Sequence, residues 1–234
     1  MNKYIKDDFE KLLKYSEKYS MGSVMHEKNF ELYYRNIHKK ALAYLILFSE
    51  VEKQNFSNNI FSEKALYYLK ESVSDVLQSL FSWANGAYKG ADLLLRSSIE
   101  NFNKAVIGNS DNSIFTEKSV YKIFEIAEHM DEYSKKMNTE SLYIVMHNIY
   151  VELCKSTHTA TNANMEHITA LVFLPKYEEE RAKIFFKMFD LLIDVFLGYF
   201  LANYKCILDK MYRVNQDIYY DAVSRDVIRT IING

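Results

Sequence analysis

The sequence predicts an all-α protein, and three observations support this. Apolar residues recur at helical spacing through most of the chain, and no segment alternates apolar and polar residues as a half-buried strand does. Helix breakers are scarce, because the 234 residues include one proline and six glycines. The 19 tyrosines and 15 phenylalanines supply large side chains for a core. We expect one domain, residues 1–234, with a four-helix core and additional packed helices.

Two helices are expected in the N-terminal part of this domain, residues 1–60. The first covers residues 4–19, where apolar residues share one face, and Gly22 lies in the break that follows it. The second covers residues 29–53, and the polar run at 55–59 predicts a loop after it.

The bundle core is expected over residues 62–213. Ser62 can cap the next helix by accepting hydrogen bonds from backbone N–H groups, and the helical pattern then runs to about Trp83. The dipeptide Asn85-Gly86 permits a turn. A further helix follows this turn and ends near Ile107.

The next part of the chain contains two predicted helices between less regular segments. A loop is expected at 108–113, and helices are expected at 116–137 and 139–156, each capped by its first threonine. Residues 157–175 lack a clear pattern. An irregular stretch of this length in a compact domain is typical of functional segments.

The longest predicted helix covers residues 177–213, and a final helix covers 216–232 in the C-terminal segment 215–234. The helix at 177–213 is apolar around most of its circumference, so it should be nearly buried at the centre of the fold. Its polar side chains form one narrow stripe: Lys187, Asp190 and Asp194.

This stripe has two interpretations. Asp190 and Asp194 lie one helical turn apart, so they can form the solvated strip of a central helix, or they can face Arg96 across the bundle. We prefer the solvated strip. The pair Lys39-Lys40 is also interpreted as solvated surface, because no interleaved aromatic residues indicate a groove for single-stranded nucleic acid.

Composition limits the function classes. The formal net charge of −2 creates no overall positive field, so RNA binding would need a local basic patch. Two cysteines, Cys154 and Cys206, are too few for a disulfide framework and indicate reduced thiols. The most apolar segment, residues 185–202, contains charged residues that disfavour a membrane span. We expect a soluble, cytoplasmic protein that does not contact a membrane.

Several common enzyme motifs are missing from the sequence. There is no Glu-x-x-His pair for a di-iron bundle, no His-Glu-x-x-His zinc motif and no zinc-finger cysteine pair. There is also no phosphate-binding Walker loop and no Gly-x-Ser-x-Gly nucleophile turn. We therefore expect no metal ion and no cofactor.

One face of the helix at 139–156 carries a stripe that includes His147, Cys154 and His158. Cys154 and His158 would lie one turn apart if the helix continued to position 158. Two ligands do not make a metal site, which usually needs at least three. We prefer to interpret these residues as a buried thiol and a surface histidine.

Arg96 and Glu100 are the first candidates for a functional site. They lie four positions apart, so both side chains project from one side of their helix, beside its apolar face. Such pairs are also common on solvated helix faces, where they stabilise a helix by only a few tenths of a kcal/mol. Spacing alone favours this ordinary surface pair.

A resemblance to a known group of proteins supports a functional site at Arg96 and Glu100 over an ordinary surface pair. The segment Gly86-Ala-Tyr-Lys-Gly-Ala-Asp-Leu-Leu-Leu-Arg-Ser-Ser-Ile-Glu100 is similar to a motif of uncharacterised bacterial helical proteins that reads Ala-x-x-Leu-x-Arg-x-x-x-Glu after a small-residue turn. A later helix in these proteins ends like Tyr-x-x-Leu-Ser-x-x-x-His. This chain has Tyr150-Val-Glu-Leu-Cys-Lys-Ser-Thr-His158, with cysteine in place of serine. Over about residues 82–159 the chain resembles the HEPN superfamily.

The resemblance implies a HEPN-like helical bundle and a role in antiviral defence, toxin–antitoxin systems or stress. Many HEPN proteins are metal-independent ribonucleases that act through an arginine and a histidine. His158 would take the proton from a ribose 2′-hydroxyl, and Arg96 would stabilise charge on the attacked phosphate. Glu100 would orient one of them. We assign Tyr150, Asn103 and Cys154 as supporting residues.

The chain departs from the usual nuclease pattern in one respect. HEPN ribonucleases carry arginine and histidine within a short Arg-x(4–6)-His motif on one helix, whereas Arg96 and His158 come from separate segments. Many HEPN-like proteins lack the catalytic pair and serve as dimerisation or nucleotide-sensing modules. The alternative function is therefore a non-catalytic interaction module. Expected partners are RNA or a nucleotide and a partner protein, and we expect a homodimer.

Overall fold

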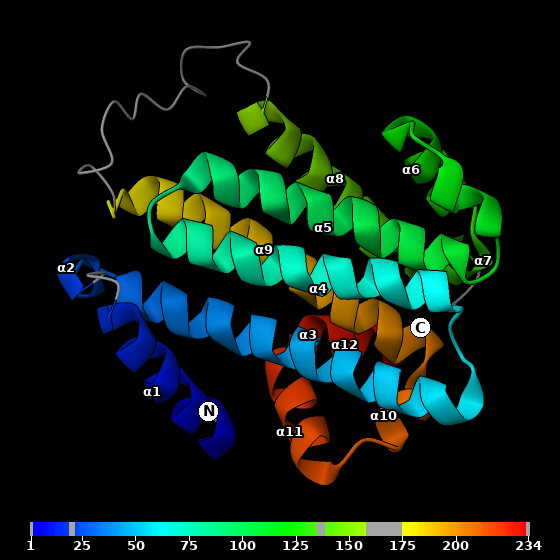
Figure 1. Ribbon diagram of the computed structural model, residues 1–234, viewed down its shortest axis with the longest axis horizontal. Helices are drawn as coiled ribbons and strands as arrows, with labels where there is room; N and C mark the ends of the chain where they lie inside the picture. Colours follow the sequence, from blue (N-terminus) through cyan, green and yellow to red (C-terminus); the bar gives the residue numbers. More distant parts are fainter. Residues whose placement is uncertain (1, 19–21, 135–138, 158–174, 233–234) are drawn as a thin grey trace.

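The computed structural model describes residues 2–18, 22–134, 139–157 and 175–232. All regular structure in these ranges is helical, which confirms the all-α prediction. Five long helices pack in a ring in which each contacts the next, so this part of the chain shows a five-helix core where four helices were expected (Figure 1). These helices are α3 (Phe30–Asn58), α4 (Glu63–Ala84), α5 (Tyr88–Gly108), α8 (Thr139–Thr157) and α9 (Glu179–Asn203).

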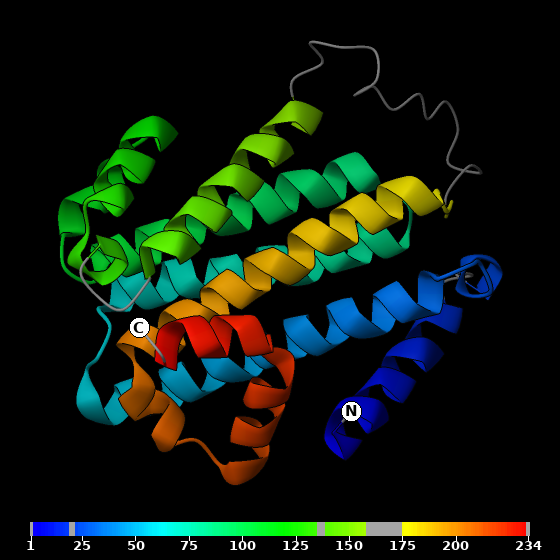
Figure 2. The same ribbon diagram turned by 180° about the vertical axis from the view of Figure 1, so that it is seen from behind.

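Shorter helices cover this ring. Helices α1 (Lys3–Lys18) and α11 (Arg213–Ala222) pack on α3, and α12 (Arg225–Ile232) packs on α9. Figure 2 shows α12 on the face of the bundle opposite α4 and α5. The remaining short elements are α2 (Gly22–Met25), the 3₁₀ helix η1 (Asn112–Thr116), α6 (Val120–Glu128), α7 (Asp131–Ser134) and α10 (Lys205–Asp209).

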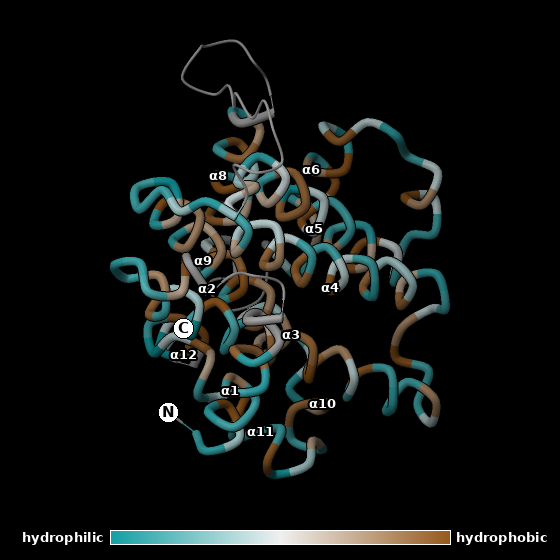
Figure 3. Tube along the Cα trace, turned by 60° about the vertical axis from the view of Figure 1, so that its left-hand side comes forward, coloured by the Kyte–Doolittle hydropathy of each residue, from teal (hydrophilic) through white to brown (hydrophobic). Residues whose placement is uncertain are grey.

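The core is one continuous set of buried side chains, most of them aliphatic or aromatic. In Figure 3 hydrophobic residues recur among hydrophilic ones along the helices, as expected of amphipathic helices that bury one face. The single tryptophan, Trp83, stacks between Phe30 and Phe185, with ring centroids 5.3 Å and 6.3 Å apart. This stack joins α4 to α3 and α9. No helix in the described part of the chain is both long and apolar enough to cross a membrane.

Helix α9 is buried as expected over its C-terminal half, since every residue from 192 to 201 is buried. Gly198 lies in this half, and a Cβ atom there would come within 2.8 Å of Val227 on α12 and 3.2 Å of Leu142 on α8. The missing side chain therefore lets α8 and α12 approach α9 closely. The longest described helix is nevertheless α3, with 29 residues against 25 for α9, contrary to expectation.

The predicted loop at 55–59 is wrong, because α3 continues through Asn58. The polar side chains at this end do not leave the helix. Asn55 remains helical, and its side-chain amide accepts a hydrogen bond from the N–H of Phe61 and donates one to the C=O of the same residue. The helix stops at Asn59, which adopts the left-handed conformation (φ 48°) that ends many helices.

The cap predicted at Thr116 is also wrong. The Thr116 hydroxyl donates to the carbonyl of Ser113 and closes η1. Ser119 caps α6 instead, by accepting a hydrogen bond from the N–H of Lys122. The chain leaves the helix at His129–Met130, so the expected helix at 116–137 is divided into α6 and α7 where the structure describes it.

The helices predicted at 177–213 and 216–232 are each divided in two. The first breaks at Tyr204, whose backbone is not helical and whose ring packs 4.9 Å from the ring of Phe61. The second breaks at Val223 and Ser224. The N–H of Ser224 donates to the carboxylate of Asp194, so a contact with α9 starts the last helix in a new direction.

The same carboxylate belongs to a buried ion pair. The Nζ atom of Lys40 lies 2.5 Å from Asp194 and 3.6 Å from Asp190, and the side chains of Lys40 and Asp194 are each 5 % exposed. Lys40 is therefore not solvated surface, and Asp194 neither belongs to a solvated strip nor pairs with Arg96. The predicted solvation of Lys40 and of Asp194 is therefore wrong. Helix α3 packs on α9 and buries the two opposite charges against each other.

Replacing Lys40 by methionine tests this pair. The Lys40→Met protein retains most of the buried volume but leaves Asp194 without its cation, so we expect a loss of about 3–5 kcal/mol in the free energy of unfolding. Urea titration followed by circular dichroism measures it. The matched control is Lys187→Met, because Lys187 is exposed on α9, and it should change stability by less than about 0.5 kcal/mol. Equal losses in the two variants would contradict the role of the pair.

A polar contact between His38 and Asp8 holds helix α1 to α3. His38 is buried, and its Nε2 lies 2.8 Å from the carboxylate of Asp8, whose side chain is 44 % exposed. Burial lowers the pKa of His38 below its usual 6.5, although the hydrogen bond and charge of Asp8 oppose that shift. The imidazole is therefore neutral at neutral pH. Phe9 packs beside it on α1, with ring centroids 5.6 Å apart.

This lowered pKa predicts a pH dependence of stability. The unfolded chain takes up a proton at His38 more readily than the native protein does, so the free energy of unfolding falls as pH decreases below about 6.5. Urea titrations at about pH 7.5 and about pH 5.5 should show a smaller decrease for His38→Gln than for wild type. His26→Gln, at an exposed histidine, should behave as wild type. A His38→Gln profile identical to wild type would show that this imidazole does not contribute.

Candidate functional site

The two motif segments meet where α5 packs on α8. Arg96 and Glu100 lie on α5 and Tyr150 lies on α8. The Nε atom of Arg96 donates to Glu100 across 3.1 Å, and the Tyr150 hydroxyl donates to the same carboxylate oxygen across 3.0 Å. Glu100 therefore accepts from both helices at one atom.

The cluster is partly accessible. The side chains of Arg96 and Glu100 are each 26 % exposed. The guanidinium carbon of Arg96 lies 5.4 Å from the centre of the Tyr150 ring, within the range of a cation–π contact. Cys154, one turn after Tyr150 on α8, is partly buried. Arg96 is thus held in one orientation by a carboxylate and an aromatic face.

The environment keeps the Tyr150 hydroxyl protonated. Burial raises the pKa of Tyr150 well above its usual value, and the negative charge of Glu100 raises it further. The phenol is therefore a hydrogen-bond donor at neutral pH and cannot serve as a base there.

A second carboxylate, which the sequence analysis missed, lies beside the cluster. Asp75 on α4 is buried and accepts a hydrogen bond of 2.8 Å from the side chain of Asn101 on α5. Burial raises the pKa of Asp75, and the charge of Glu100 contributes to the shift. The signal was a polar residue on the apolar face of the helix at 62–83, next to Val76. Negative charge therefore balances or exceeds the charge of Arg96 here.

Asn103 does not join this cluster. It lies on α5 three positions after Glu100 and is fully buried, but its amide makes no hydrogen bond within the described part of the chain. The hydroxyls of Tyr133 and Tyr199 are buried without partners in the same sense, and their rings lie 5.0 Å apart. Buried polar groups of this kind are usually satisfied by internal water.

His158, the proposed acid–base residue, lies outside the described residues and directly follows Thr157, the last residue of α8. His147, in the same sequence stripe, packs among aromatic rings, 5.2 Å from Phe124 and 6.0 Å from Tyr143. Where the structure describes the chain, no three histidine, cysteine, aspartate or glutamate side chains are grouped closely enough to hold a metal ion.

Comparisons with known proteins add no further information about this site. No protein-family model, curated protein or solved structure matches the chain.

A double-mutant cycle tests the contact between the helices. Tyr150→Phe removes the hydroxyl that donates to Glu100, so we expect it to cost about 1 kcal/mol of stability. In a Glu100→Gln background the same change should cost less, and the coupling energy should be at least about 0.5 kcal/mol. Thermal unfolding by circular dichroism provides the values. Tyr121→Phe, at a tyrosine that is 77 % exposed on α6, is the control, and additive Tyr150 and Glu100 effects would exclude a shared network.

Proposed function

We propose that this chain is a HEPN-like, metal-independent ribonuclease that acts in bacterial stress or antiphage defence. One observation supports the proposal. The two segments that carry the HEPN resemblance lie about 50 residues apart in sequence, yet their polar residues meet, because Tyr150 on α8 bonds to Glu100 on α5. If Glu100 and Tyr150 had no shared role, nothing would require them to lie in contact.

In this proposal each residue has a separate task. Arg96 binds the phosphate of the scissile bond, since a guanidinium can stabilise charge that develops on a phosphate oxygen. His158 takes the proton of the ribose 2′-hydroxyl, whose oxygen attacks the adjacent phosphorus and forms a 2′,3′-cyclic phosphate. The bond from phosphorus to the 5′-oxygen breaks, and that oxygen leaves with a proton from the imidazolium or from water. Glu100 and Tyr150 orient Arg96 through the contacts described above. The substrate is RNA, and the reaction uses no metal.

A second candidate function is a non-catalytic interaction module, and the charges around Arg96 favour it. Glu100 already pairs with the guanidinium, and Asp75 lies close enough to interact with Glu100. Two carboxylates near one cation oppose the approach of a phosphate. In this case the cluster stabilises the α5–α8 contact, and the chain acts by forming a homodimer or by binding a partner protein.

RNA cleavage in the presence of a chelator distinguishes the two functions. We expect purified wild type to cleave single-stranded RNA, and we expect Arg96→Ala and His158→Ala to reduce the rate by at least about 10²-fold. Arg35→Ala is the matched control, because Arg35 also pairs with a glutamate on its own helix, Glu31 on α3. Circular dichroism confirms that each variant is folded.

Two outcomes would contradict the ribonuclease. Wild type that leaves RNA intact would exclude the activity under these conditions, and Arg96→Ala that cleaves at the wild-type rate would exclude the assigned site. If Arg96→Ala instead loses stability and light scattering shows that it no longer self-associates, the interaction module is supported.

A further inference from the structure

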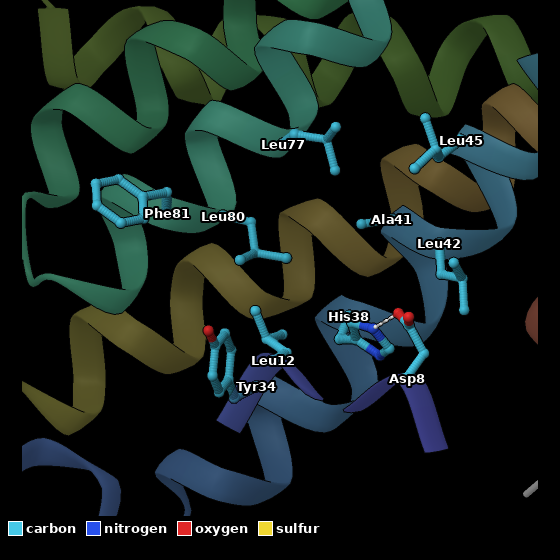
Figure 4. A pocket seen from close by; sticks show the side chains of 10 residues that line it. All are labelled: Asp8, Leu12, Tyr34, His38, Ala41, Leu42, Leu45, Leu77, Leu80 and Phe81. Carbon is cyan, nitrogen blue, oxygen red and sulfur yellow. Dashed lines mark hydrogen bonds and ion pairs between the residues drawn. The ribbon is translucent and has the colours of Figure 1, made fainter. Parts of the chain in front are cut away.

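A cavity of about 210 Å³ is lined by residues of α1, α3 and α4, and none of them belongs to the Arg96 cluster (Figure 4). Its walls are mainly aliphatic and come from all three helices. Leu77 and Leu45 are each 38 % exposed at its edge, so the cavity opens to the surface. The leucine and phenylalanine side chains that line it are those of Leu12, Leu42, Leu45, Leu77, Leu80 and Phe81.

One polar pair interrupts this apolar wall. Asp8 and His38 both line the cavity, and Figure 4 shows their side chains bonded to each other at one end. His38 is buried, and its Nδ1 atom has no hydrogen-bond partner within the described residues, so Nε2 carries the proton that Asp8 accepts. Because burial lowers the pKa of His38, the imidazole is neutral at neutral pH.

The cavity therefore contains one net negative charge. Among the residues that line it, Asp8 is the only acidic one, and they include no lysine or arginine. The nearby arginine of α3, Arg35, does not neutralise Asp8, because its guanidinium pairs with Glu31 and lies 5.4 Å from the Phe9 ring. A carboxylate that a ligand desolvates needs a cation, and the surrounding leucines need apolar surface.

We propose that this cavity binds a small aliphatic amine, with its ammonium group on Asp8 and its hydrocarbon chain against the leucines of α3 and α4. His38 is a positioning residue that holds the Asp8 carboxylate at the end of the cavity. An apolar cavity of about 150 Å³ binds benzene, so this one has room for roughly six carbons. The site is independent of the proposed ribonuclease, since it shares no residue with the Arg96 cluster.

Three ligands that share a hexyl chain and differ only in their head group test the proposal: hexylamine, 1-hexanol and heptanoate. Isothermal titration calorimetry of the full chain at neutral pH should show one hexylamine site per chain. Hexanol should bind about fivefold more weakly, because it lacks the charge that pairs with Asp8. Heptanoate should bind most weakly, because its carboxylate faces another carboxylate.

Two substitutions locate the site. Asp8→Asn should abolish the preference for hexylamine over hexanol and leave hexanol binding intact, whereas Asp7→Asn, at an exposed residue of α1, should change neither. Leu77→Trp places a larger side chain at the edge of the cavity and should weaken both ligands at least fivefold, with circular dichroism confirming the fold. Heptanoate binding equal to hexylamine binding, saturation by none of the three ligands, or full binding to Leu77→Trp would each overturn the proposal.

Discussion

The ion pair between Lys40 and Asp194 joins two core helices, α3 and α9, and positions the start of the short helix α12. Lys40 comes from α3 and Asp194 from α9, and the same carboxylate accepts the backbone N–H of Ser224 at the start of α12. Neither charge is stable inside a protein without the other. The two helices must therefore pack in the one register that joins these atoms, and α12 must begin beside them. Hydrophobic contact alone would tolerate several registers, so this pair supplies specificity to an otherwise apolar interface.

The Arg96 cluster is also a polar contact between two helices, but it is less buried than the pair of Lys40 and Asp194. Glu100 accepts hydrogen bonds from its own helix and from Tyr150 on α8, so it joins two helices while it orients the guanidinium. A rigid guanidinium can bind a phosphate without first losing side-chain entropy. The same carboxylate weakens that binding through its charge. The balance between these effects decides between a catalytic and a structural cluster, and a phosphate-containing substrate must compete with Glu100 for Arg96.

Sequence reasoning identified the features that depend on neighbours along the chain. Periodicity located the helices, Ser62 caps α4 as expected, and spacing put Arg96 and Glu100 side by side. It missed features that depend on residues far away in sequence. Lys40 resembled a surface lysine because its partner lies 154 positions later, and no local pattern marks the break at Tyr204, which accompanies packing on Phe61.

The position of Trp83 has a practical consequence. This is the only tryptophan in the chain, it is 1 % exposed, and it stacks on Phe30 and Phe185 while its indole N–H donates to the carbonyl of Ala182. Its ring also lies 6.0 Å from the ring of Tyr34, which lines the cavity beneath α1. The emission spectrum of the native protein is therefore an intrinsic optical probe of the junction of α3, α4 and α9. Because the Tyr34 ring both contacts Trp83 and lines the cavity, we expect a ligand of the proposed site to alter this emission without any attached dye.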